Sequence, residues 1–255
     1  MSALHTLSIR ATRHTVDRGA GGRYTPRLLR HRFGAAIAFV LGGCATAGGG
    51  SGPEPAGPPA IDPSLAPAIA QATALEAPLQ ILFDWTFEEG SARFNGRGVT
   101  RVAPPEHARL DLFGPRGEGY LSAALVGMEL RLPPGADNAP LPPPELLWTV
   151  LGVFRAPEAA TLTLARREGT ETRLQYTRGD ERWSFRFEGD VLRSAEWVGP
   201  GQGRRTVELT GDGDNGLPGV AVYRDWIAFR ELRVTLQEVS RVDGFPSDTW
   251  IVGGG

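Results

Sequence analysis

The sequence contains a single cysteine, Cys44, and no lysine. One cysteine cannot form a disulfide within the chain, so the fold must be stabilised by burial of apolar side chains. Only one of the four histidines, His107, lies beyond residue 31. Zinc sites and nucleophile–base pairs depend on clustered cysteine and histidine side chains, and these counts therefore argue against both.

Long apolar runs are also missing. The run Phe33–Leu41 is too short for a membrane-spanning helix, which needs about 20 apolar residues. A basic flank, a short apolar core and small residues before a cleavage point are typical of a secretory signal. The motif Leu41–Cys44 resembles the lipobox of bacterial lipoproteins, which implies that Cys44 is acylated and becomes the mature N-terminus. We therefore expect residues 1–43 to be a lipoprotein signal peptide. The alternative is a buried core segment that ends in cysteine.

Beyond the expected signal peptide the chain has no surplus of basic residues. It carries 20 of the 27 arginines and 28 of the 29 acidic residues. Phosphate binding needs a basic surface, so this negative balance argues against a nucleic-acid partner.

Residues 44–62 are rich in glycine and proline. This composition predicts a flexible tether that begins at lipidated Cys44 and holds a folded domain, residues 63–255, away from the membrane. Ala45, rather than aspartate, follows the cysteine. By resemblance to the sorting rule of bacterial lipoproteins, this implies an anchor in the outer membrane, on its periplasmic face.

Most of the remaining chain alternates between apolar and polar side chains, as in strands with one buried face. The clearest examples are residues 81–88 and 182–188, where aromatic residues alternate with polar ones. Only two helices are expected, over residues 63–76 and 145–154. About ten short strands with tight turns between them predict a mainly β fold. Its single antiparallel sheet should curl over its apolar face, and the second helix should cover or plug the opening.

Carboxylates are the only plentiful catalytic groups. Pairs such as Asp180/Glu181 and Asp212/Asp214 fall in predicted turns, where acidic residues ordinarily cap and solubilise the chain. The segment Asp212–Gly216 has the spacing of a calcium loop but lacks the glutamate that would complete it. We predict no catalytic residue, no metal and no cofactor, and we do not expect an enzyme.

Three segments resemble a known family. Arg109–Gly117 with the apolar strand pair that follows it up to Leu132, the helical Leu146–Gly152 and the closing Trp250–Val252 are similar to segments of LolB, the outer-membrane receptor of the bacterial lipoprotein-localisation system. The resemblance implies membership of the LolA/LolB superfamily. It implies an unclosed β-barrel whose helices cover a hydrophobic cavity for acyl chains. The implied partners are the acyl chains of lipoproteins or other lipids and a LolA-like periplasmic carrier.

The resemblance directs attention to the apolar side chains on the strand faces and on the second helix. These side chains form a core by default, and they line a cavity only if they enclose an open volume. The candidates for the cavity lining are Phe83, Trp85, Phe94, Leu130, Leu147, Leu151, Trp183, Phe185 and Phe187.

The turn Pro115–Gly117 departs from the family pattern. LolB receptors carry an exposed leucine in a Pro-Leu-Gly turn between the third and fourth strands, and Arg116 stands at the matching position here. An arginine cannot insert as an apolar side chain, but it can meet anionic lipid head groups. We therefore predict that Arg116 is the membrane-facing residue of this loop.

The sequence patterns and the resemblance to LolB support two candidate functions. The first is an outer-membrane lipoprotein that binds acyl chains and acts in lipoprotein localisation or lipid transfer. The second is a non-catalytic scaffold or interaction lipoprotein of the cell envelope, with a filled barrel. An apolar void favours the first function, and close packing throughout the interior favours the second.

Overall fold

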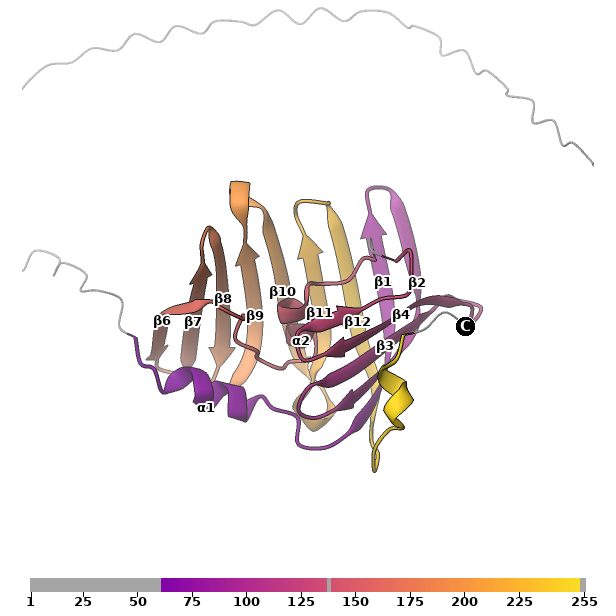
Figure 1. The fold of residues 1–255 in the computed structure, drawn as a ribbon, viewed down its shortest axis with the longest axis horizontal. Coiled ribbons are helices and arrows are strands. Elements are labelled where there is room, and N and C mark those ends of the chain that lie inside the picture. The colour runs from indigo at the N-terminus through magenta and orange to yellow at the C-terminus, as the bar shows by residue number, and fades with distance from the viewer. Residues whose placement is uncertain (1–60, 137–138, 253–255) are drawn as a thin grey trace, which may run out of the picture. The chain divides into compact units, whose positions relative to one another are not determined.

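A computed structural model describes residues 61–136 and 139–252 of the chain. The predicted signal peptide, Cys44 and nearly all of the predicted tether lie outside these residues. The described residues form one antiparallel sheet of 12 strands with two short α-helices (Figure 1). The first group of elements is α1 (Leu65–Ala72), β1 (Leu79–Glu89), β2 (Ala92–Ala103), β3 (His107–Phe113), β4 (Gly119–Val126), β5 (Glu129–Arg131) and α2 (Pro144–Val150). The second group is β6 (Thr161–Glu168), β7 (Glu171–Arg178), β8 (Glu181–Glu188), β9 (Val191–Val198), β10 (Arg204–Asp212), β11 (Pro218–Asp225) and β12 (Arg230–Arg241).

The sheet is built from two meanders that meet in its middle. The strand order is β5-β4-β3-β2-β1-β12-β11-β10-β9-β8-β7-β6, so every neighbour is consecutive in sequence except the pair β1–β12. The chain therefore passes once from one edge of the sheet to the other, between β5 and β6, and this connection carries α2. The edge strands β5 and β6 do not pair with each other. This confirms the predicted mainly β fold with a single, unclosed antiparallel sheet, although the sheet has more strands than expected.

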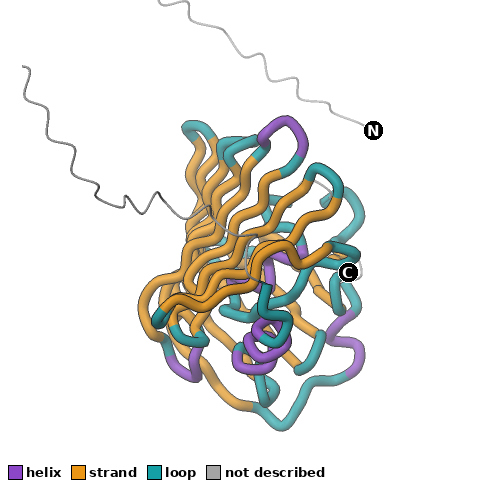
Figure 2. Tube along the Cα trace, turned by 90° about the vertical axis from the view of Figure 1, so that its left-hand side faces the viewer, coloured by secondary structure: helices purple, strands orange, loops and turns teal. Residues whose placement is uncertain are grey.

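The sheet curls around its apolar face, and α2 lies on the concave side (Figure 2). Alternate residues of β1, from Leu79 to Phe87, are buried there. Opposite them, β2 carries Gly96 and Gly98, paired with Trp85 and Phe83. A side chain at Gly98 would overlap the Phe83 ring, so the glycines make room for these two aromatic side chains.

Both helices are shorter than predicted. Helix α2 begins at Pro144, the position at which proline is favoured, but it ends at Val150 rather than Phe154. Gly152 adopts a φ of +75°, and the Val153 N–H donates to the Trp148 carbonyl at 3.1 Å. This is the glycine-terminated helix end that sequence periodicity alone did not reveal.

One half of the interior is filled with aromatic side chains. Phe154, just beyond α2, packs edge-to-face on Phe185 and Phe187 of β8, with ring centroids 4.9 and 5.6 Å apart. Tyr176 of β7 and Trp183 of β8 are buried in the same cluster. The open volume of the domain must therefore be sought in the other half, around β1 to β4.

Candidate functional site

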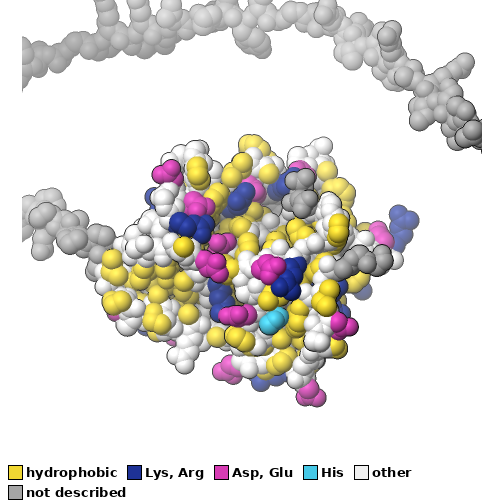
Figure 3. Space-filling view, viewed as in Figure 1, with side chains coloured by type: hydrophobic (Ala, Val, Ile, Leu, Met, Phe, Trp, Pro, Cys, Tyr) yellow, Lys and Arg dark blue, Asp and Glu magenta, His cyan; other side chains and the backbone are white. Residues whose placement is uncertain are grey.

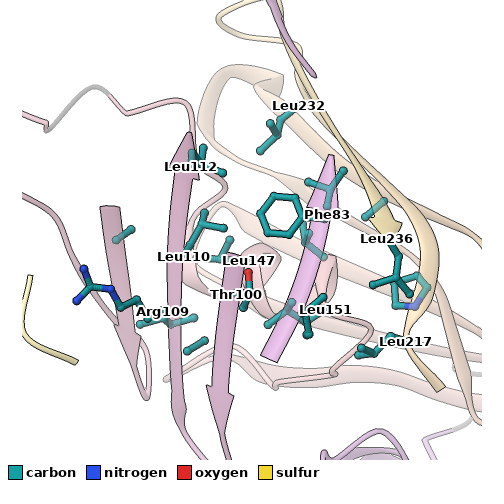
Figure 4. A pocket seen from close by; sticks show the side chains of 18 of the residues that line it. Phe83, Thr100, Arg109, Leu110, Leu112, Leu147, Leu151, Leu217, Leu232 and Leu236 are labelled. Atoms are coloured by element: carbon teal, nitrogen blue, oxygen red, sulfur yellow. The ribbon is translucent and has the colours of Figure 1, made fainter. Parts of the chain in front are cut away.

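An apolar cavity of about 70 Å³ lies between α2 and the inner face of the sheet (Figure 4). Its lining comes from β1 to β5, from α2 and the residue after it, and from β11, β12 and the loop before β11. Six leucines account for much of this lining: Leu110, Leu112, Leu147, Leu151, Leu232 and Leu236. The alternation of β3 and β12 places four of these side chains on the inner face, and Leu147 and Leu151 close the space above them from α2 and the residue after it.

The cavity has almost no polar lining. Thr100 contributes a buried hydroxyl group, and Arg109 contributes part of its side chain. The Arg109 guanidinium points away from the cavity (Figure 4) and donates from Nε to both carboxylate oxygens of Asp111, at 3.0 and 3.1 Å. Arg101 and Ser122 also donate to Asp111, at 2.6 and 2.7 Å. This ion-pair network satisfies the charges outside the cavity and leaves the interior apolar.

Four of the predicted lining residues lie on the cavity: Phe83, Leu130, Leu147 and Leu151. The structure does not bring the other five there. Trp183, Phe185 and Phe187 are buried in the packed aromatic cluster. Trp85 is buried on β1, where its indole N–H donates to the Arg97 and Phe113 carbonyls and its ring lies 5.0 Å from that of Tyr120. Phe94 is 44% exposed because it lies near the free end of the β1–β2 hairpin, where its ring stacks on Phe87 at 6.3 Å.

Sequence reasoning missed the leucines of β3 and β12, the loop residue Leu217 and Pro218, the first residue of β11. The alternation in residues 230–241 showed that Leu232 and Leu236 share a face, but no sequence signal shows that β12 pairs with β1. The lining therefore depends on strand order, which brings together residues far apart in the chain.

A second pocket, of about 420 Å³, adjoins the first at the end of the sheet where α1 lies. It is bounded by the end of α1, by the β8–β9 turn and by the loop between β10 and β11. Leu151, Leu217 and Pro218 line both pockets. Arg193 lies on its rim and forms ion pairs with Glu188 and Asp212, at 3.1 and 3.4 Å. The apolar cavity and the more polar second pocket are thus separated by a wall of shared apolar residues.

Arg116 lies in the turn between β3 and β4, the turn for which the sequence predicted it. The turn closes through a hydrogen bond from the Gly117 N–H to the Gly114 carbonyl at 3.0 Å. The Arg116 N–H donates to Glu118 Oε2 at 2.9 Å, and the Arg116 residue is exposed. The guanidinium is therefore available to solvent.

Ionisable side chains elsewhere mostly form exposed pairs across neighbouring strands. Basic and acidic side chains are interspersed on the face shown in Figure 3. Within residues 61–136 and 139–252, no cluster of histidine, cysteine and carboxylate side chains could hold a metal ion. Three buried groups are perturbed: burial raises the pKa of Tyr176 and of Tyr223, and the pKa of Asp225 is lowered. For Asp225, burial opposes ionisation, but hydrogen bonds from Arg205 and from two backbone N–H groups outweigh it.

No protein-family model matches the chain, and no curated protein matches it in sequence. Solved structures do match it in fold. A LolA superfamily protein of Nitrosomonas europaea superposes with a TM-score of 0.51 at 11% identity, over 73% of this chain and 97% of that one. The chain has a LolA-like fold.

A second structure supports the same fold assignment. A Vibrio parahaemolyticus domain assigned to outer membrane lipoprotein sorting superposes on the chain with a TM-score of 0.52 at 4% identity. The matched region covers 73% of this chain and 94% of that domain. The LolA-like domain thus spans nearly the full length of both relatives. No helix among its described residues is long and apolar enough to cross a bilayer.

Proposed function

We propose that this protein is an outer-membrane-anchored lipoprotein that binds acyl chains, of lipoproteins or of other lipids. In this proposal it acts in lipoprotein localisation or in lipid transfer to the outer membrane. The observation that carries the proposal is the leucine-lined cavity between α2 and the sheet. Such a lining favours hydrocarbon over a polar ligand. The LolA-like fold supports the same class of ligand, and a LolA-like periplasmic carrier would be the donor.

The lipid anchor of this proposal is Cys44, which lies outside the described residues. Three acyl chains on its thiol and amino group would hold the protein far more firmly than a single acyl chain, whose membrane binding is marginal. The periplasmic face of the outer membrane is the location that this anchor implies.

The size of the cavity sets a condition on binding. Pockets for small ligands typically enclose about 300–1,000 Å³, whereas this cavity encloses about 70 Å³. An acyl chain therefore requires that α2 shift away from the sheet or that lining leucines change rotamer. Helix α2 is held in place by apolar contacts and by a hydrogen bond from Trp148 Nε1 to the Gly127 carbonyl at 2.9 Å.

The small volume also favours the second candidate function. A non-catalytic scaffold lipoprotein needs no cavity, and the aromatic half of the interior is already filled. In that case the cavity is a packing defect between α2 and the sheet.

An acyl-binding measurement separates the two functions. Gently purified protein would be analysed by mass spectrometry for co-purifying acyl chains, and the affinity for a fluorescent acylated peptide would be measured. Ala123→Leu should fill the cavity and weaken peptide binding at least tenfold, because Ala123 lines it and pairs with Leu110 on the inner face of the sheet. Ala195→Leu is the matched control, since Ala195 is buried in the aromatic cluster away from the cavity. Absence of peptide binding by the unaltered protein would favour the scaffold.

Arg116 provides a separate test of the membrane contact. In the proposal its guanidinium meets lipid phosphate groups, a contact worth about 1 kcal/mol that salt weakens. Arg116→Glu should slow transfer of the acylated peptide to anionic liposomes at low salt and have little effect at high salt. Equal transfer by both forms at low salt would show that Arg116 does not contact the membrane. It would leave the acyl-binding proposal untouched.

A further inference from the structure

The β11–β12 hairpin ends in an exposed apolar turn. Trp226, Ile227 and Phe229 are 50%, 51% and 78% exposed, and Phe229 is the most exposed of the large apolar side chains of the domain. Figure 1 shows this hairpin at the end of the sheet opposite α1. We name residues 226–229 the apolar tip. We infer that the apolar tip docks on a lipid bilayer, with these three side chains inserted at the membrane–water interface.

Backbone N–H groups of the tip already form hydrogen bonds within the domain. The Trp226 N–H donates to the Arg204 carbonyl at 3.0 Å. Asp225 Oδ1 accepts from the N–H groups of Ile227 and Ala228, at 2.9 and 3.1 Å. Unsatisfied backbone N–H groups are the main cost of placing a turn in an apolar medium. Three consecutive N–H groups of this turn are already hydrogen-bonded, so removing water from them costs little free energy.

The charge beside the tip is also compensated. Arg205 Nε donates to Asp225 Oδ2 at 3.0 Å, and the Arg205 guanidinium lies over the Trp197 ring at 4.6 Å. The carboxylate that organises the tip therefore does not present an unpaired negative charge to anionic lipid. A rigid turn that keeps apolar side chains in solvent is preorganised for a partner.

Phe229 has an uncommon backbone conformation. Its φ is +54°, a region that a bulky side chain other than glycine seldom adopts. This conformation costs free energy, yet it buries nothing, because Phe229 remains in solvent. The loop of four residues between the paired Asp225 and Arg230 thus leaves the ring in solvent, where it is free to meet a surface outside the domain.

The chemistry of the tip favours a bilayer over a protein partner. A specific protein interface typically involves about 20–30 residues on each side. The exposed large apolar side chains of the β11–β12 and β1–β2 hairpin ends and of β4 are far fewer: the three of the tip, Phe94 and Tyr120. Tryptophan and other large apolar side chains are the residues that anchor proteins at the membrane–water interface. A few such side chains suffice when another anchor supplies most of the affinity.

The predicted lipid anchor at Cys44 does not prevent this contact. The segment from Cys44 to Ile61 spans at most about 60 Å. Strand β12, with 12 residues, measures about 40 Å. The tether can therefore reach past the length of the sheet and let the tip meet the bilayer in which Cys44 is anchored. The docking contact itself depends neither on lipidation nor on acyl binding in the cavity.

The test uses residues 52–255. All described strands and both helices lie within this segment, which forms one compact unit, so it retains the whole fold without the predicted anchor. Its partition to vesicles of phosphatidylethanolamine and phosphatidylglycerol would be measured by sedimentation. The combined change Trp226→Ser, Ile227→Ser and Phe229→Ser should weaken partition at least tenfold, and high salt should not abolish binding by the unaltered segment.

Val191 supplies the matched control. It is 46% exposed at the start of β9, at the other end of the strands, so Val191→Ser should leave partition unchanged. The segment has no cysteine, and an environment-sensitive dye can therefore be placed at single sites through Phe229→Cys or Val191→Cys. On addition of vesicles the dye at 229 should shift to the blue, and the dye at 191 should not. These single variants decide the matter even if the triple variant misfolds.

The docking contact is overturned if the unaltered segment does not bind vesicles, or if the triple variant folds and binds equally well. An equal effect of Val191→Ser would also overturn it. Dimers of the unaltered segment that dissociate in the triple variant, without vesicle binding, would instead assign the tip to contact with a second copy. An intact tip contact with no acylated-peptide binding would leave this inference standing and remove the proposed function of the cavity.

Discussion

At the scale of single residues, the inner face of the sheet combines tightly packed rings with rings beside open space. Phe185 is 2% exposed and packs edge-to-face on Phe154 at 4.9 Å. Phe185→Ala should lower the free energy of unfolding by about 3–5 kcal/mol, because the neighbouring rings cannot collapse into the space. Phe94→Ala, at a site 44% exposed, should cost less than about 1.5 kcal/mol. Urea unfolding measures both changes, and equal losses would contradict the assignment of Phe185 to a packed core.

Asp225 gives the domain a predictable response to acid. Burial opposes its ionisation, but Arg205 and the N–H groups of Ala228 and Ile227 outweigh burial and hold its pKa below the ordinary value of 3.8. The folded state therefore binds this proton more weakly than the unfolded state. The stability that the carboxylate contributes is present above the unfolded pKa and is lost as the pH falls through the folded pKa.

Asp225→Asn should lower stability at pH 7 and reduce the further loss of stability below about pH 4. Urea midpoints measured between pH 2.5 and 7 provide the check. Asp243→Asn, at an exposed position, serves as the control. A variant that loses as much stability on acidification as the unaltered domain would show that Asp225 is not the group that responds. The same substitution should loosen the apolar tip, since Asp225 accepts hydrogen bonds from two of its N–H groups.

At the scale of elements, α2 has one face in the core and another on the cavity. Leu146 is fully buried in the aromatic half, whereas Leu147 lines the cavity. Leu146→Ala should cost about 2–5 kcal/mol of unfolding free energy. Leu147→Ala should cost less, because its side chain is only partly enclosed, and should enlarge the cavity and strengthen acylated-peptide binding. Thermal melting and peptide titration of the two variants provide the comparison. Weaker peptide binding by the Leu147 variant would show that the ligand does not lie beneath α2.

At the scale of the whole molecule, the predicted anchor and the domain make separable contributions to membrane binding. Cys44→Ala should move the full-length protein from the detergent phase to the aqueous phase in detergent phase partitioning, since no acyl chain can then be attached. The apolar tip alone should not retain the protein in the detergent phase, because its contact is weak and reversible. Retention of the variant in the detergent phase would contradict lipidation at Cys44.

The two ends of the sheet face different surroundings in this arrangement. Strand β11 begins at Pro218, which lines both pockets, and its last residue precedes the apolar tip. With 8 residues it separates the pocket end from the tip by about 26 Å. A domain docked through the tip would present the second pocket away from the bilayer, toward a carrier in the periplasm.

Local pattern in the sequence determined most of the strands, the buried faces of β1 and β8 and the exposed Arg116 turn, since alternation and turn chemistry act over a few residues. It also allowed the fold class to be predicted, because a sheet with one apolar face must cover that face. The end of α2 was missed, since Gly152 ends the helix through its backbone conformation while the apolar pattern continues.

Only the tertiary structure decided where the interior is filled and where it is open. Phe154, expected within a helix, lies beyond α2 and fills the space beside Phe185. The pairing of β1 with β12 and the single crossing between β5 and β6 bring leucines of distant segments together around the cavity. Side-chain alternation is the same whether a strand borders a void or a ring. Whether a strand borders a void or an aromatic ring depends on which strands lie next to it. Strand order is set by contacts between residues far apart in the chain.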